Sequence, residues 1–203
     1  MHYGRILAVV GVVLAAVGFL LQSASSAGEA ALAQLSQVDP NFPDGFDNTW
    51  TALYNDTAWA AIVFAIAGVA SLLVALIPPL DKPMARLYGL AASVLGVLML
   101  VIGIFATMGA MDDADTLEAG FAQAAAAGAI PEAYTVDIGW GWYLLILSGI
   151  LVAIGGVVSL IARPDEDALP PGDQSPEEAV SYTHLTLPTI QHWCRSRWSP
   201  YHL

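Results

Sequence analysis

Four long apolar runs dominate the chain, and none of them contains a charged residue. A helix needs roughly 20 apolar residues to cross a bilayer, and three of the runs reach that length. Hydrocarbon offers no hydrogen-bond partners and barrel strands alternate in polarity, so continuous runs of this kind predict helices. We therefore predict an all-α fold, a left-handed four-helix transmembrane bundle with two extracytoplasmic loops containing short helices. The predicted spans cover about residues 6–21, 58–77, 87–108 and 138–161, within a membrane domain of residues 1–163.

Composition supports this class. Of the 203 residues, 57% are hydrophobic and 12% are charged, whereas soluble domains carry about 25% charged residues. The net charge of −12 and the six scattered Lys and Arg residues exclude nucleic acid as a partner, because phosphate binding needs clustered basic side chains. Cys194 is the only cysteine, so an internal disulfide is excluded.

The basic residues predict the orientation. Arg5, Lys82, Arg86 and Arg163 all fall on one side of a four-span chain, and positive charge marks the cytoplasmic side. The two loops of the opposite side, residues 22–57 and 109–137, hold eleven acidic residues and no Lys or Arg. We expect a multi-pass protein of the plasma (inner) membrane with both termini cytoplasmic. Aromatic residues that favour the membrane interface flank the outer ends of two spans, namely Trp59, Trp140, Trp142 and Tyr143.

The first span has a second interpretation. Residues 1–27 resemble a secretory signal, with a basic start, an apolar stretch and the small residues Ser25, Ser26 and Ala27 as a cleavage site. Cleavage would leave three spans and a free outer N-terminus.

Small residues recur every seven positions in each span, which favours one close-packed seam per helix. In lipid, helices associate through close backbone approach, and a seven-residue period suits a left-handed bundle. The alternative is chance spacing in an Ala- and Gly-rich sequence, above all in the second span. The glycines predicted to pack are Gly11, Gly18, Gly68, Gly89, Gly96, Gly103, Gly149 and Gly156.

The predicted spans lack the ionisable side chains that are typical of a transport pathway. No Asp, Glu, Lys, Arg or His lies inside any of them, which counts against proton-coupled transport. Their hydroxyl groups are expected to bond the backbone of their own helix or a neighbouring helix. These hydroxyls belong to Ser71, Ser93, Thr107, Ser148 and Ser159.

The two outer loops hold the candidate binding residues. We predict a helix over residues 25–37 that continues the first span, and a helix over residues 116–128 capped by Asp112 or Asp115. A dense set of oxygen ligands suggests a calcium site, although its spacing departs from the EF-hand pattern. The alternative is a solvated acidic surface. The candidate ligands are Asp39, Asn41, Asp44, Asp47, Asp112, Asp113 and Asp115.

The C-terminal part differs in character. Residues 164–180 are acidic and Pro-rich, as in a disordered tail. Residues 181–203 begin with the string SYTHLTLPTI, which resembles translated adaptor sequence from raw sequencing reads, so we interpret them as a non-native tail. The nearby His184, His192 and Cys194 fit no standard zinc spacing.

Two resemblances bear on the class. The topology is similar to that of tetraspan proteins, although the paired loop cysteines of claudins are absent. The entry to the last span, Gly139-Trp140-Gly141-Trp142-Tyr143, resembles the last span of small bacterial membrane proteins, notably actinobacterial ones. That resemblance implies a bacterial inner membrane and no particular activity.

No catalytic constellation is present in the sequence, so we predict that the protein is not an enzyme. The primary hypothesis is a structural or accessory membrane protein that acts through its outer loops or by helix packing with a membrane partner. The alternatives are a subunit of an oligomeric channel or transporter, and an extracytoplasmic sensor of divalent cations. The expected partners are the lipid bilayer and a second copy or another membrane protein, and calcium is the single cofactor considered.

Overall fold

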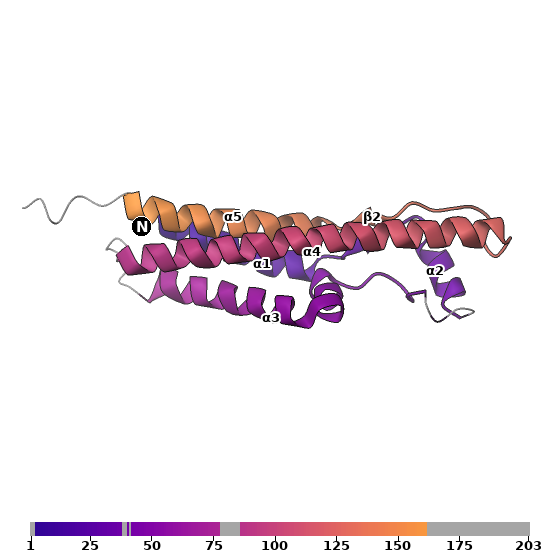
Figure 1. The fold of residues 1–203 in the computed structure, drawn as a ribbon, viewed down its shortest axis with the longest axis horizontal. Helices are drawn as coiled ribbons and strands as arrows, with labels where there is room; N and C mark the ends of the chain where they lie inside the picture. Colours follow the sequence, from indigo (N-terminus) through magenta and orange to yellow (C-terminus); the bar gives the residue numbers. More distant parts are fainter. Residues whose placement is uncertain (1–2, 38–39, 41, 78–85, 162–203) are drawn as a thin grey trace, which may run out of the picture. The chain divides into compact units, whose positions relative to one another are not determined.

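The computed structural model describes residues 3–37, 40, 42–77 and 86–161. The chain divides into two units, Met1–Ala162 and Arg163–Leu203, and everything below concerns the first. Both tail predictions, for residues 164–180 and 181–203, lie outside the described residues. The elements in chain order are α1 (Tyr3–Leu20), β1 (Ala24–Ser25), α2 (Glu29–Leu35), α3 (Thr49–Leu76), α4 (Arg86–Ala126), β2 (Asp137–Ile138) and α5 (Trp140–Ile161) (Figure 1).

Four of these helices, α1, α3, α4 and α5, are long and apolar enough to cross a membrane. This confirms the predicted helical class, and the number of such helices matches the four predicted spans. The long helices keep their polar backbone groups bonded internally, as a hydrocarbon environment requires. Within the described ranges the two strands are two residues long each. They pair antiparallel, with Ala24 opposite Ile138 and Ser25 opposite Asp137.

Helix α4 is much longer than predicted. Its 41 residues correspond to about 61 Å at 1.5 Å per residue, and Figure 1 shows it continuing past the end of α3 toward α2. The predicted break after Met108, with Asp112 or Asp115 capping a new helix, is therefore wrong. The Asp112 carbonyl accepts a hydrogen bond from the Thr116 hydroxyl (2.8 Å) inside the continuous helix. The Asp112 and Asp115 side chains are exposed, so they need no cap position.

The first outer loop also departs from the prediction. Instead of continuing to residue 37, α1 ends at Leu20, and the chain passes through β1 before α2 begins. Helix α3 begins at Thr49, well before residue 58, because the Asn48 side chain accepts a hydrogen bond from the Thr51 backbone N–H (2.8 Å) as an N-cap. Thr57 interrupts α3 with φ −141° and ψ 75°, so this helix is kinked where the predicted span starts.

Helix α5 has α1 along one face and α4 along another, and glycines permit both contacts. A Cβ atom on Gly11 would lie 2.8 Å from the Ser148 carbonyl oxygen, and one on Gly18 would lie 3.0 Å from the Gly141 carbonyl oxygen. Such approaches leave no room for a side chain. We call the α1–α5 and α4–α5 contacts the glycine seams. On the α4 side the closely approached residues are Gly89, Gly96, Gly103, Gly149 and Gly156.

Helix α3 joins the bundle differently. A Cβ atom on Gly68 would meet only the Met99 Cε atom, 3.9 Å away, which is ordinary van der Waals distance. Its contacts come instead from larger buried side chains, such as Phe64 and Leu53, each 1% exposed. Phe64 makes an edge-on contact with Phe19 of α1, with ring centroids 5.4 Å apart. Gly68 is thus in the predicted row but not in a glycine seam.

The hydroxyl groups of the spans are used inside their own helices, as predicted. Each donates a hydrogen bond of 2.7–3.0 Å to a carbonyl three or four residues earlier. Serine and threonine commonly satisfy themselves in this way in helices. The donors are Ser71, Ser93, Thr107, Ser148 and Ser159.

Candidate functional site

A second hydrophobic core lies beyond one end of the bundle. We call the elements that build it the head: the described residues between Ala24 and Asn48, together with residues 112–138. Leu32 of α2 and Phe121 of α4 are each 0% exposed. The Phe121 ring packs edge-on against Tyr134, with centroids 5.6 Å apart. The buried members of this core are Ala31, Leu32, Leu35, Ala114, Phe121, Ile130 and Val136.

Hydrogen bonds also hold the two segments of the head together. The Ser26 hydroxyl donates to the Thr135 carbonyl (2.6 Å), and the Val136 backbone N–H donates to a carboxylate oxygen of Glu118 (2.7 Å). The first bond joins residues 109 positions apart in the sequence, and the second ties the chain that returns toward α5 to α4. The head is therefore a folded unit rather than a pair of solvated loops.

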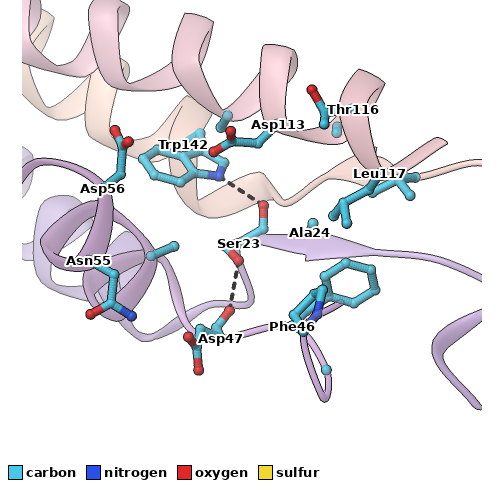
Figure 2. A pocket seen from close by; sticks show the side chains of 16 residues that line it. Ser23, Ala24, Phe46, Asp47, Asn55, Asp56, Asp113, Thr116, Leu117 and Trp142 are labelled. Atoms are coloured by element: carbon cyan, nitrogen blue, oxygen red, sulfur yellow. Dashed lines mark hydrogen bonds between the residues drawn. The ribbon is translucent and has the colours of Figure 1, made fainter. Parts of the chain in front are cut away.

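Trp142 anchors the head to the bundle. It is 4% exposed, and its indole N–H donates to the Ser23 carbonyl (2.8 Å). The Ser23 hydroxyl in turn donates to the Asp47 carbonyl (2.9 Å). Buried tryptophan usually finds such a partner for its N–H. These bonds connect α5 with both ends of the segment between α1 and α3 (Figure 2).

A cavity of about 440 Å³ opens where the head meets the bundle. Figure 2 shows Asp56 of α3 and Asp113 of α4 beside the Trp142 ring, with Asn55 and Asp47 lower in the view, and all five residues line the cavity. A Cβ atom on Gly109, one turn before Asp113, would lie 3.9 Å from an Asp56 carboxylate oxygen. The two acidic side chains therefore extend from neighbouring helices into one space.

Residues 22–57 and 109–137 contain no Lys or Arg, so they supply no basic side chain to pair with the carboxyl groups of this cavity. Partial burial raises the pKa of the Asp113 carboxyl, and the negative charges of Asp56 and Asp112 raise this pKa further. Both causes disfavour the ionised form. A positively charged occupant would relieve this repulsion, and the carboxyl groups of Asp47, Asp56 and Asp113 line the space it would enter.

The raised pKa of Asp113 gives a testable pH dependence. The folded-state pKa lies above the ordinary value of 3.8, so protonation of Asp113 favours folding. That contribution is fully present below pH 3.8 and is lost as the pH rises through the raised pKa. Asp113→Asn keeps the side chain neutral, so we expect it to unfold at a higher temperature than the wild type at pH 7. The difference should vanish as the pH falls toward 3.8, as measured by thermal unfolding in detergent.

Asp115→Asn is the matched control, because Asp115 is an exposed acidic residue of the same helix and does not line the cavity. Solvent screening limits the size of the effect at a side chain as exposed as Asp113. An Asp113→Asn stabilisation that stayed constant from pH 4 to pH 8 would contradict the assignment.

The structure brings only part of the predicted calcium set together. Asp47 and Asp113 line the same cavity, whereas Asp44, Asp112 and Asp115 do not line it. Asp39 and Asn41 lie outside the described residues. Among the residues that the structure describes, no three His, Cys, Asp or Glu side chains are close enough to hold a metal ion together.

Asn55, Asp56 and Trp142 line the cavity but were not among the binding residues predicted from the sequence, where Trp142 was expected only as an aromatic residue of the membrane interface. A usable signal existed: Asp56 is the last charge before the second apolar run, and Asp112 and Asp113 are the first charges after the third. Consecutive spans are antiparallel, so these two positions must meet at the same side of the membrane.

Fold and cavity together define a four-span helical membrane protein with a folded head at one end of the bundle. Comparison with known protein families, curated protein sequences and solved structures finds no match for this chain.

Proposed function

We propose that this chain is a non-enzymatic accessory membrane protein whose head docks a positively charged partner at the extracytoplasmic surface. In this role the bundle is an anchor and the head is the recognition element. The observation that carries the proposal is the second core, in which Leu32 and Phe121 are completely buried. Loops that merely connect helices have no need of a core of their own.

Charge supports the choice of partner. The outer segments contribute eleven acidic residues and no Lys or Arg. Those on the exposed surface of the head include Glu29, Asp44, Asp115, Glu132 and Asp137. A surface of one sign attracts partners of the opposite sign and accelerates their association. A basic protein segment is therefore the partner chemistry that this head fits best.

The orientation is part of the proposal. The basic residues before the tail, Arg5, Lys82, Arg86 and Arg163, support a cytoplasmic location for both termini under the positive-inside rule. The head then lies outside the cytoplasm, on a plasma (inner) membrane of a bacterial type. The channel alternative has less support, because the five span hydroxyls bond within their own helices in the described part of the spans.

Site-specific photo-crosslinking in native membranes tests the docking role. A benzophenone side chain at Glu132, which is exposed on the head, is expected to give a discrete protein adduct. Raising the salt concentration shortens the screening length from about 10 Å at 0.1 M to about 3 Å at 1 M. We therefore expect the adduct yield to fall several-fold over this range.

The matched control carries the same side chain at Val97, which is 51% exposed on the membrane-spanning part of α4. A salt-independent adduct at Glu132, or the same adduct at both positions, would contradict docking through the acidic head. Charge reversal by Asp137→Lys should reduce the Glu132 adduct at low salt, because Asp137 is an exposed acidic residue of the same head.

A further inference from the structure

A second hollow lies on the side of the bundle between α3 and α4. It has a volume of about 480 Å³ and is lined by the part of α3 on both sides of the Thr57 kink and by the part of α4 that precedes the head. We call it the α3–α4 groove. Its rim carries Trp59 and Phe105, which are 68% and 69% exposed, so the groove opens sideways from the bundle.

The walls of the groove are apolar along most of their length. Every lining residue from α4 is apolar, and the α3 side adds Leu53, Ala60 and Val63. This stretch lies in the charge-free part of α4, residues 87–111, which is the part that crosses the membrane. Water fills apolar spaces poorly because it finds no hydrogen-bond partners there. A hydrocarbon chain from the surrounding bilayer is the occupant that such walls accept.

One end of the groove is different. Among the residues that the structure describes, Asp56 and Thr57 are the only polar ones that line it, and both belong to the end near the head. The Thr57 hydroxyl donates to an Asp56 carboxylate oxygen (2.8 Å), which leaves the second carboxylate oxygen of Asp56 for another donor. Asp56 also lines the acidic cavity beneath the head, together with Asp113 and Asn55. The two hollows therefore share Asp56.

An apolar groove that shares a carboxylate with an acidic cavity matches an amphiphile whose headgroup ends in an ammonium. Asp56, Asp113 and Asp47 supply negative charge, and the outer segments supply no Lys or Arg to neutralise it. A primary ammonium has three N–H donors that can bond carboxylates, and charge-assisted bonds of this type are the strong ones. A quaternary ammonium has no such donors, and a headgroup without an ammonium offers the carboxylates no positive charge.

We propose that the α3–α4 groove and the acidic cavity together bind one ethanolamine-headed phospholipid, with an acyl chain in the groove and the ammonium at Asp56 and Asp113. Asp56 immediately precedes the kink at Thr57 and lines both hollows, so its carboxylate lies at their junction. This lipid site is independent of the docking role, since it uses the base of the head and the side of the bundle.

Native mass spectrometry of the full chain in detergent tests the site with three added phospholipids that have the same acyl chains. The headgroups are phosphatidylethanolamine, phosphatidylcholine and phosphatidylglycerol. We expect one phosphatidylethanolamine to be retained at least tenfold more tightly than either of the others. Charge-assisted hydrogen bonds are about twice as strong as neutral ones, and a tenfold change in retention corresponds to about 1.4 kcal/mol. Asp56→Asn should therefore lower retention of phosphatidylethanolamine about tenfold.

Asp115→Asn is the charge-matched control and should retain the lipid as the wild type does. Asp113→Asn gives a second variant that is expected to fold, and it should also lose preference for phosphatidylethanolamine. Equal retention of all three lipids by the wild type would overturn the proposal. If phosphatidylcholine were retained as tightly as phosphatidylethanolamine, recognition of a primary ammonium would be overturned. If Asp115→Asn lost the lipid as Asp56→Asn does, the specific role of Asp56 would be overturned. None of these outcomes depends on whether the head docks a protein.

Discussion

Replacing Gly96 with alanine is expected to destabilise the bundle by about 1–3 kcal/mol, the usual range for overpacking a core. A Cβ atom at this position would lie 2.6 Å from the Ala153 Cα atom and 2.8 Å from the Val152 carbonyl carbon. Both are backbone atoms of α5, so no flexible side chain can move aside. Helix α4 would have to shift away from α5 along the glycine seam. Unfolding of the purified protein in mixed detergent micelles, followed by circular dichroism, measures the change.

Gly68→Ala is the control with the same chemistry in another helix. Its new methyl group would meet only the Met99 Cε atom at 3.9 Å. Alanine is better than glycine in a helix interior by about 0.8–1.0 kcal/mol, so Gly68→Ala should be neutral or stabilising. If the two variants lost stability equally, the glycine seam would not be the source of the Gly96 effect.

The second large effect is expected in the head. Phe121→Ala removes a side chain that is 0% exposed and its edge-on contact with Tyr134. Truncation of a buried phenylalanine costs about 3–5 kcal/mol, which is comparable to what a small core contributes. We expect the head to open while the bundle stays folded, because the two buried clusters are separate. Hydrogen exchange of α2 and of the residues after Gly120 should rise strongly, and exchange in α5 should stay unchanged.

Phe105→Ala serves as the control, since Phe105 lies in the same helix but is 69% exposed. It should leave exchange in the head unaltered. Equal loss of protection in the head and in α5 for Phe121→Ala would mean that the two cores fold as one cooperative unit, contrary to the expectation.

The membrane helices could be predicted because charge-free apolar runs admit only one structure in hydrocarbon. The extension of α4 could not be predicted from the same signals. Asp112 and Asp115 match the composition of a helix start, but the favourable helix propensity of the alanine-rich segment that follows lets the helix continue through them. The local sequence is compatible with a new helix start at these residues and with a continuous helix. The packing of Phe121 and Ala114 into the head core favours the continuous helix.

The seven-residue glycine pattern predicts which face of a helix could form a close contact, but not which neighbouring helix it contacts. Gly68 has the same spacing as Gly96, yet only Gly96 approaches a backbone. The acidic cavity likewise depends on tertiary structure that the local sequence does not indicate. The kink at Thr57 has no proline or glycine beside it, so nothing in the local sequence indicates that Asp56 turns toward Asp113.

The unbroken length of α4 has a mechanical consequence. A helix that runs along the bundle from Arg86 and continues into the core of the head is a stiff shaft with no hinge between the bundle and the head. A load applied to the head therefore cannot be absorbed by bending a linker, and it must turn or slide the shaft against α5. Any signal that crosses this protein would travel as rotation or translation of α4, and the close glycine contacts of the seam would resist it.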